Sequence, residues 1–237
     1  SMPIGAYSEK QVMPEEKLIL VPDGISDEVA SCITLKGITA EYLLHRAYPL
    51  KKGDKVLYHA AAGALGQILC PWANALGAEV IGTVGSKAKE EIAKKNGCHH
   101  VINYSEKNFV KEVEKIVGKD GIDVVYDGVG AKTFKGSIET LKIRGMMVAF
   151  GNASGYVDTL DIKKDINAKG LFFTRPSIAH YTVKREELVE SAKKVFDAIL
   201  TKKFTVEISK KYSLKDTAQA HKDLEARLLT GPAVIIP

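Results

Sequence analysis

A run of small residues between an apolar segment and an amphipathic segment carries the clearest chemical signal in this sequence. It reads Ala60-Ala61-Ala62-Gly63-Ala64-Leu65-Gly66 and matches the pattern G-x-G-x-x-G with Ala61 in the first glycine position. Gly63 lets the backbone approach a pyrophosphate, and Gly66 lets the following helix pack closely on the preceding strand. The N–H groups at the start of that helix then face the phosphates. The loop predicts a dinucleotide site, and a small-residue turn that binds nothing is the alternative.

The end of the next apolar segment, residues 79–84, indicates which dinucleotide fits. Proteins that bind NAD carry an acidic residue there, which hydrogen-bonds the ribose and repels the additional phosphate of NADP. This chain reads Gly82-Thr83-Val84-Gly85-Ser86-Lys87-Ala88-Lys89 and places two lysines where a 2′-phosphate would lie. Tyr104, after the third segment, is expected beside the adenosine. The pattern favours NADPH, and a solvated helix start is the alternative explanation for Lys87 and Lys89.

Two further loops follow apolar segments. Asp127-Gly128-Val129-Gly130 comes after the fourth, and Phe150-Gly151-Asn152-Ala153-Ser154-Gly155 comes after the fifth. Ligands of open α/β sheets bind at the carboxyl ends of the strands. Asn152 and Ser154 are therefore expected to hydrogen-bond the nicotinamide side of the cofactor, with ordinary surface-turn chemistry as the alternative.

Alternating strands and helices must position these loops. Apolar runs of strand length lie near residues 55–59, 79–84, 100–103, 123–127, 146–150 and 171–174. Helical patterns near residues 64–75, 87–96, 107–117 and 132–141 separate the first five runs. This alternation predicts parallel strands with right-handed crossovers, hence a doubly wound parallel α/β sheet of the Rossmann type. Further helices are predicted near residues 26–46, 185–200 and 214–228 and a strand at 233–236, whereas residues 3–22 hold only strand-like pieces.

The composition narrows the class of protein. With 237 residues, 45% of them hydrophobic, the chain can bury one substantial core or at most two small domains. It lacks a membrane-spanning run and a signal pattern, so we expect a cytosolic protein. The 34 basic and 29 acidic residues are spread along the chain, so binding of nucleic acid is not expected. Cys32, Cys70 and Cys98 form no C-x-x-C pair, and no histidine cluster at metal-ligand spacing lies near them, so no metal site is predicted.

No catalytic side chain is predicted. A nicotinamide cofactor itself supplies the hydride, so the protein needs only to orient the cofactor and the acceptor. Neither paired carboxylates nor a Ser-His-Asp arrangement stands out. Five histidines are expected to be structural or exposed: His59, His99, His100, His180 and His221.

Taken together, the motifs resemble those of the zeta-crystallin-type quinone oxidoreductases of the medium-chain dehydrogenase/reductase superfamily, over essentially the whole chain. Beside the glycine loop, the matching segments are residues 101–104, 125–127, 150–152, 174–177 and 231–237. The resemblance implies an NADPH-dependent enzyme that reduces a small-molecule quinone without zinc and works as a homodimer. Related enzymes of the same fold reduce alkenal or enoyl double bonds, and fold does not choose between these substrates. A third alternative is an NADPH-binding module without turnover.

The resemblance also implies a set of cofactor-binding residues. Lys89 and Tyr104, with Arg227 nearby, would carry the 2′-phosphate. The family often has two glycines where this chain has Gly63-Ala64. Zinc-dependent alcohol dehydrogenases place a metal-binding cysteine near the position of Leu35, which cannot ligate zinc. The implied set is Thr39, Gly63, Ala64, Leu65, Gly66, Gly85, Lys89, Tyr104, Gly128, Phe150, Gly151, Asn152, Ser154, Arg175, Pro176, Ser177 and Arg227.

The same resemblance implies three parts of the chain. Residues 1–24 would be a remnant of a GroES-like catalytic domain whose larger portion is absent, and residues 25–180 would be the NADP-binding Rossmann domain. Residues 181–237 would be helices and a strand that return to the catalytic domain. The sixth strand region, residues 170–176, would be an exposed sheet edge, and an unpaired edge invites pairing with a second copy. We therefore predict a homodimer through this edge.

Overall fold

The structure is a computed structural model that describes residues 5–226, 228, 229 and 231–237. The chain divides into two compact units. One unit consists of residues 40–177, and the other combines residues 1–39 with residues 178–237. The division into residues 1–24, 25–180 and 181–237 stays a prediction.

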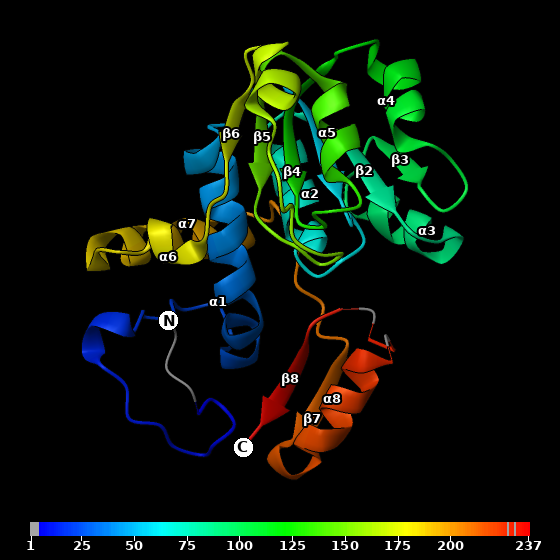
Figure 1. Ribbon diagram of the computed structural model, residues 1–237. Helices are drawn as coiled ribbons and strands as arrows, with labels where there is room; N and C mark the ends of the chain where they lie inside the picture. Colours follow the sequence, from blue (N-terminus) through cyan, green and yellow to red (C-terminus); the bar gives the residue numbers. More distant parts are fainter. Residues whose placement is uncertain (1–4, 227, 230) are drawn as a thin grey trace. The chain divides into compact units, whose positions relative to one another are not determined.

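A six-stranded parallel sheet forms the centre of the unit of residues 40–177 (Figure 1). Its spatial order is β3-β2-β1-β4-β5-β6, with the reversal between β1 and β4. This order is that of dinucleotide-binding sheets, so the predicted doubly wound parallel α/β fold is confirmed. The strands are β1 (Lys55–His59), β2 (Glu79–Val84), β3 (His100–Asn103), β4 (Ile122–Asp127), β5 (Leu141–Ala149) and β6 (Phe172–Thr174).

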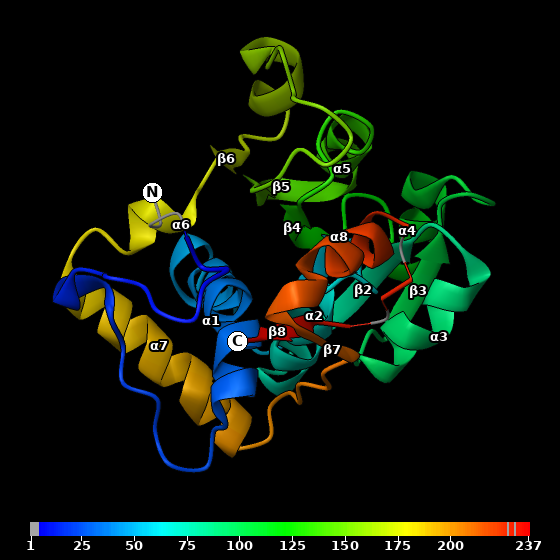
Figure 2. The same ribbon diagram turned by 90° about the horizontal axis from the view of Figure 1, so that it is seen from below.

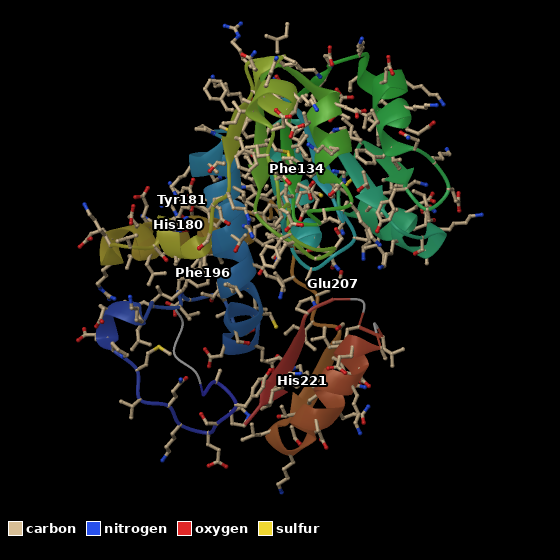
Figure 3. The ribbon with its side chains drawn as sticks, in the orientation of Figure 1. Phe134, His180, Tyr181, Phe196, Glu207 and His221 are labelled. Carbon is tan, nitrogen blue, oxygen red and sulfur yellow. The ribbon has the colours of Figure 1, made fainter. Side chains whose placement is uncertain are left out.

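Helices cover both faces of this sheet because its strands are apolar on both sides. Every residue of β4 is buried. Figure 2 shows α2 and α3 on one side and α4 and α5 on the other. Phe134, labelled in Figure 3, begins α5 and lies edge-to-face with Phe173 at 6.0 Å between ring centroids. The four crossover helices are α2 (Gly66–Ala75), α3 (Lys87–Lys95), α4 (Phe109–Val117) and α5 (Phe134–Thr140).

Some predicted boundaries differ from the structure. Strand β5 begins at Leu141, five residues before the predicted start near residue 146, with an irregular register against β4. The helix predicted over residues 26–46 is α1 (Asp27–Tyr42) followed by a π-helical turn at Leu43–Ala47. The Leu43 carbonyl oxygen accepts two hydrogen bonds, one of 3.3 Å from Tyr48 N and one of 3.0 Å from the hydroxyl of the buried Tyr126. A side chain of β4 is therefore bonded to the turn that ends the helix.

The second unit contains α6 (Ile178–Tyr181), α7 (Arg185–Leu200) and α8 (Thr217–Glu225). Strands β7 (Lys210–Ser213) and β8 (Ala233–Ile236) form a parallel two-stranded sheet. We predicted β8 but missed β7, whose sequence Lys-Lys-Tyr-Ser is mostly polar and exposed. The strand-like pieces before α1 form no strand within residues 5–26, where a 3-10 turn at Glu15–Lys17 is found instead.

A buried carboxylate joins α8 to β7 within this unit. Asp223 accepts hydrogen bonds from Lys210 Nζ at 2.7 Å, from the Tyr212 hydroxyl at 2.5 Å and from Gln219 Nε2 at 2.7 Å. Lys210, Tyr212 and Gln219 together lower the pKa of Asp223 to about 2. The carboxylate therefore stays charged, and helix and strand stay joined, to strongly acidic pH.

Candidate functional site

The carboxyl ends of the six parallel strands bring most of the predicted cofactor-binding residues to one edge of the sheet. Thr39 belongs to the other unit, on α1, where its hydroxyl donates to the Leu35 carbonyl at 2.8 Å. Arg227 lies outside the described residues. The residues in the loops after β1 to β6, or in the first turn of the helix that follows, are Gly63, Ala64, Leu65, Gly66, Gly85, Lys89, Tyr104, Gly128, Phe150, Gly151, Asn152, Ser154, Arg175, Pro176 and Ser177.

The loop after β1, residues 60–66, is here called the phosphate loop. It begins with Ala60 in a left-handed conformation (φ 63°) and turns through a hydrogen bond of 2.8 Å from Gly63 N to the Ala60 carbonyl. A Cβ on Gly66 would lie 2.3 Å from the carbonyl oxygen of Ala61, so only glycine lets α2 start this close to β1. Gly63 is exposed. This open, tightly turned backbone ahead of α2 fits the pyrophosphate of a dinucleotide.

Gly85 and Tyr104 form a second small cradle, after β2 and β3. A Cβ on Gly85 would lie 2.6 Å from the Tyr104 hydroxyl oxygen, so the tyrosine ring packs directly on the glycine. The Tyr104 side chain is 47% exposed, which leaves an aromatic surface open to a ligand. Lys87 and Lys89 lie in the exposed first turn of α3, directly after Gly85. An aromatic ring beside two cations fits a phosphorylated adenosine.

Two loops, residues 128–131 and 150–155, are here called the nicotinamide loops, and they are bonded to each other. Ser154 N donates to the Val129 carbonyl at 2.7 Å, and Ala131 N donates to the Gly155 carbonyl at 3.1 Å. The Ser154 hydroxyl donates to the same Val129 carbonyl at 2.8 Å and accepts from Lys132 N at 3.0 Å. The predicted contact of Ser154 with the cofactor stays a prediction, and its hydroxyl also holds the two loops together.

The remaining predicted residues continue this edge of the sheet. A Cβ on Gly151 would lie 2.4 Å from the Gly128 carbonyl oxygen, and the Phe150 ring stacks on Tyr58 at 6.3 Å between centroids. After β6, Arg175 Nη1 donates to the Pro176 carbonyl at 3.2 Å. Gly151 therefore allows a contact with the Gly128 backbone that any side chain would prevent.

A chain of buried polar side chains lies beneath the loops, and the sequence analysis missed it. His59 Nδ1 is 2.8 Å from Thr83 Oγ1, and His59 Nε2 is 2.9 Å from Ser137 Oγ. Ser137 Oγ is 3.1 Å from Asp127 Oδ2, and Thr133 Oγ1 is 2.7 Å from the same oxygen. All five side chains are buried. Burial lowers the pKa of His59, against the smaller opposing effect of the Asp127 charge, so the ring is neutral near pH 7.

This arrangement differs from a hydrolytic Ser-His-Asp site. The Asp127 carboxylate contacts the serine instead of the histidine, and Ser137 is completely buried and out of reach of a substrate. Asp127 Oδ1 also accepts from Val129 N at 2.8 Å and from Gly130 N at 2.9 Å. Ser137 is therefore not positioned as a nucleophile. The hydrogen-bonded side chains instead support the loop that follows β4. The signal available in the sequence was polar residues at the ends of β1, β2 and β4.

Among the residues that the structure describes, no three histidine, cysteine or acidic side chains are grouped so that they could hold a metal ion. Cys32, Cys70 and Cys98 are free thiols. Within the described part of the chain, no helix has the length and apolar character needed to cross a membrane.

Comparison with known proteins gives several matches. Residues 64–200 match the family described as zinc-binding dehydrogenase. The 2-haloacrylate reductase of Burkholderia sp is 45% identical over 99% of this chain, and quinone oxidoreductase 1 of Escherichia coli (strain K12) is 42% identical over 99%. The chain covers 72% of the length of each. The crystal structure of Escherichia coli quinone oxidoreductase complexed with NADPH matches with a TM-score of 0.87 and 42% identity, over 94% of this chain and 69% of that one.

Proposed function

Because this chain belongs to the quinone oxidoreductase family of the medium-chain dehydrogenase/reductase superfamily, we propose that it is the cofactor-binding part of an enzyme that reduces quinones with NADPH. The observation that carries the choice of cofactor is the cradle of Gly85 and Tyr104. Two exposed lysines stand beside it, where a protein that binds NAD has an acidic residue. The similar Escherichia coli structure contains NADPH.

Each loop of this edge has its own task in the proposal. The phosphate loop binds the pyrophosphate with backbone N–H groups, and Lys89 and Tyr104 bind the 2′-phosphate. The nicotinamide loops orient the reacting ring and exclude water from one side of it. When bound, NADPH supplies the hydride, so no side chain of this chain needs to act as an acid or base. Further proposed contacts come from Thr39, Arg175, Pro176, Ser177 and Arg227.

A fluorescence titration of this chain with NADPH and with NADH tests the proposal. We expect NADPH to bind at least about tenfold more tightly, a difference of about 1.4 kcal/mol. In Lys89→Gln this preference should shrink because a cation at the 2′-phosphate is lost, while affinity for NADH stays unchanged. Lys111→Gln, which removes an exposed lysine of α4, is the matched control. Equal affinities of the unsubstituted chain for the two nucleotides would remove the claim for NADPH.

Reduction of an activated carbon–carbon double bond is the second candidate function. The observation that favours it is the 45% identity with a 2-haloacrylate reductase. Oxidation of NADPH, followed by absorbance with 1,4-benzoquinone or with 2-chloroacrylate as acceptor, separates the two activities. If NADPH binds but neither acceptor is reduced, the chain is an NADPH-binding module.

We also propose a homodimer formed through residues 170–176, the segment that contains strand β6. Strand β6 is at the edge of the sheet, and its Phe172 and Phe173 side chains are 58% and 37% exposed. An edge with unpaired backbone groups and exposed rings favours pairing with a second copy. Light scattering should give the mass of a dimer for the unsubstituted chain and that of a monomer for Phe172→Glu. A monomeric unsubstituted chain would contradict the proposal.

The proposal also covers the cellular location of the protein and the origin of the two ends of the chain. We place the protein in the cytosol, because Cys32, Cys70 and Cys98 are free thiols and the cytosol keeps thiols reduced. Cell fractionation tests this. We further propose that residues 1–24 and 181–237 derive from a GroES-like catalytic domain that flanks the Rossmann domain of residues 25–180. The compact unit made of both ends of the chain supports a common origin for them.

A further inference from the structure

Four buried side chains connect the loops proposed to hold the two halves of NADPH. They are Thr83, His59, Ser137 and Asp127, here called the relay. Thr83 and His59 are paired across β2 and β1, and Asp127 ends β4, the strand on the other side of β1. The relay therefore crosses the point where the strand order of the sheet reverses, which is where dinucleotides bind in this fold.

The hydrogen-bonding capacities of the four groups define a direction for the relay. Ser137 Oγ has one hydrogen, and its acceptors are Asp127 Oδ2 at 3.1 Å and the Thr133 carbonyl at 2.9 Å. We assign this hydrogen to the Asp127 carboxylate, because a charged oxygen is a stronger acceptor than a ring nitrogen. Ser137 Oγ then accepts from His59 Nε2, which carries the ring proton in this assignment. The other nitrogen of the neutral ring, Nδ1, then accepts from the hydroxyl of Thr83. Every bond of the relay thus points from Thr83 towards Asp127.

Each end of the relay is bonded to one of the loops. At one end, the Thr83 carbonyl accepts a hydrogen bond of 3.0 Å from Ala61 N in the phosphate loop. At the other end, Asp127 Oδ1 accepts from Val129 N and Gly130 N in the nicotinamide loops. A buried polar group left without a partner costs about 1–3 kcal/mol. A shift of one loop relative to the other therefore breaks a bond that water cannot replace.

We propose that His59 is a positioning residue, whose relay fixes the distance between the phosphate loop and the nicotinamide loops so that NADPH contacts both at once. His59 touches neither the cofactor nor the acceptor and acts through Thr83 and Ser137. The inference rests on the proposed function, because it assigns the two halves of NADPH to these loops. It predicts that weakening the relay affects a ligand that spans both loops and spares a ligand that occupies one.

Two substitutions each cut one bond of the relay. In His59→Gln the side-chain amide reaches the position of Nε2 and keeps the contact with Ser137, and in His59→Asn it reaches the position of Nδ1 and keeps the contact with Thr83. Ser137→Ala removes the central link with little change in volume. For all three variants we expect NADPH to bind about tenfold more weakly, while 2′,5′-ADP, which carries only the adenosine half, changes by less than about twofold. Fluorescence or calorimetric titration measures both.

Phe109→Leu is the matched control. The Phe109 ring packs edge-on against His59 at 5.0 Å between centroids but makes no hydrogen bond in the relay. Its loss should affect stability without separating the affinities for NADPH and 2′,5′-ADP. Equal losses for both ligands in the relay variants would show a merely structural role and overturn the inference, and so would unchanged NADPH affinity.

A second measurement needs neither a variant nor a ligand. Nitrogen NMR of the unsubstituted chain reports which ring nitrogen of His59 carries the proton, and we expect a neutral ring with the proton on Nε2. A proton on Nδ1 overturns the relay even if every variant unfolds. If the unsubstituted chain fails to bind NADPH at all, the proposed function fails. If it binds NADPH but the relay variants show no selective loss, only the inference about His59 fails.

Discussion

The two edges of the central sheet connect neighbouring strands in different ways. At the carboxyl edge, buried neutral groups such as His59, Thr83 and Ser137 join the strand ends. At the amino edge, lysines pair with aspartates: Lys142 contacts Asp123, and Lys169 Nζ lies 2.5 Å from Asp120 Oδ1. These lysines are 47% and 21% exposed.

The two kinds of connection differ in how they respond to a small shift of the strands. A partly exposed ion pair tolerates small shifts, because water and mobile side chains adjust around it, and it contributes about 1 kcal/mol. A buried hydrogen-bonded group loses its partner outright when the geometry changes, at a cost of about 1–3 kcal/mol. The buried hydrogen-bonded groups lie beneath the loops that we propose to hold NADPH. We therefore expect substitutions at the carboxyl edge to cost more than comparable ones at the amino edge.

The largest effect is expected for Gly66→Ala at the carboxyl edge. The added Cβ would lie 2.3 Å from the Ala61 carbonyl oxygen and within 3 Å of two further backbone atoms, none of which can move aside alone. We expect a loss of about 3 kcal/mol in unfolding free energy and loss of NADPH binding. Urea denaturation and nucleotide titration measure the two effects.

Gly53→Ala is the control at the amino edge. Gly53 has φ 88°, but an added Cβ meets no atom within 4 Å, so only backbone strain is introduced. That strain should cost about 1 kcal/mol. Equal costs at residues 53 and 66 would mean that steric contact between α2 and β1 is not what requires glycine in the phosphate loop.

Asp127 should give the next largest effect. In Asp127→Ala the N–H groups of Val129 and Gly130 and the hydroxyls of Thr133 and Ser137 lose their acceptor, which should cost about 2–3 kcal/mol. Asp127→Asn keeps one oxygen for the two N–H groups, and the hydroxyls can rotate to accept from its amide, so about 1 kcal/mol is expected. Chemical denaturation measures both variants. If both variants lose the same unfolding free energy, the hydrogen bonds that Asp127 accepts are not the cause of the loss.

The sequence allowed the fold to be predicted because its signals are local. Apolar runs and helical periodicity lie within single segments, so six strands and their crossover helices were found to within a few residues. Strand β7 was missed because Lys210 and Lys211 are polar. The π-helical turn was missed too, and one of its contacts, the bond from Tyr126 to Leu43, joins residues 83 apart. These features depend on tertiary contacts that no local pattern carries.

The candidate site divides in the same way. The phosphate loop was predictable because glycine spacing reflects a steric requirement within seven residues. The relay was not, because its partners are 24, 78 and 10 residues apart and only the sheet order brings them together. His59 was expected to be structural or exposed, and nothing in its own segment indicated Ser137 as a partner. Hydrogen bonds between polar side chains that are far apart in the sequence therefore cannot be predicted from local motifs.

Acid should weaken the carboxyl edge through His59. Burial lowers the pKa of the folded imidazole below its ordinary value of 6.5. Below about pH 6.5 the unfolded chain binds a proton that the folded chain does not, so the unfolding free energy falls as pH falls, by up to about 1.4 kcal/mol per pH unit. Denaturation of the unsubstituted chain and of His59→Gln between pH 7 and pH 5 isolates this effect. Parallel pH dependences in the two proteins would exclude His59 as its source.

The smallest effects are expected for the lysines of the amino edge. Lys169 is the less exposed, and it donates to the carbonyls of Glu139 and Leu141 as well as to Asp120, so Lys169→Met should cost about 1 kcal/mol. Lys142→Met should cost about 0.5 kcal/mol, because its partner Asp123 still accepts from Lys55 N at 2.7 Å. Added salt should reduce the difference between Lys142→Met and the unsubstituted chain, because exposed charges are screened. A cost at Lys142 as large as that of Asp127→Ala would remove the distinction between the two edges.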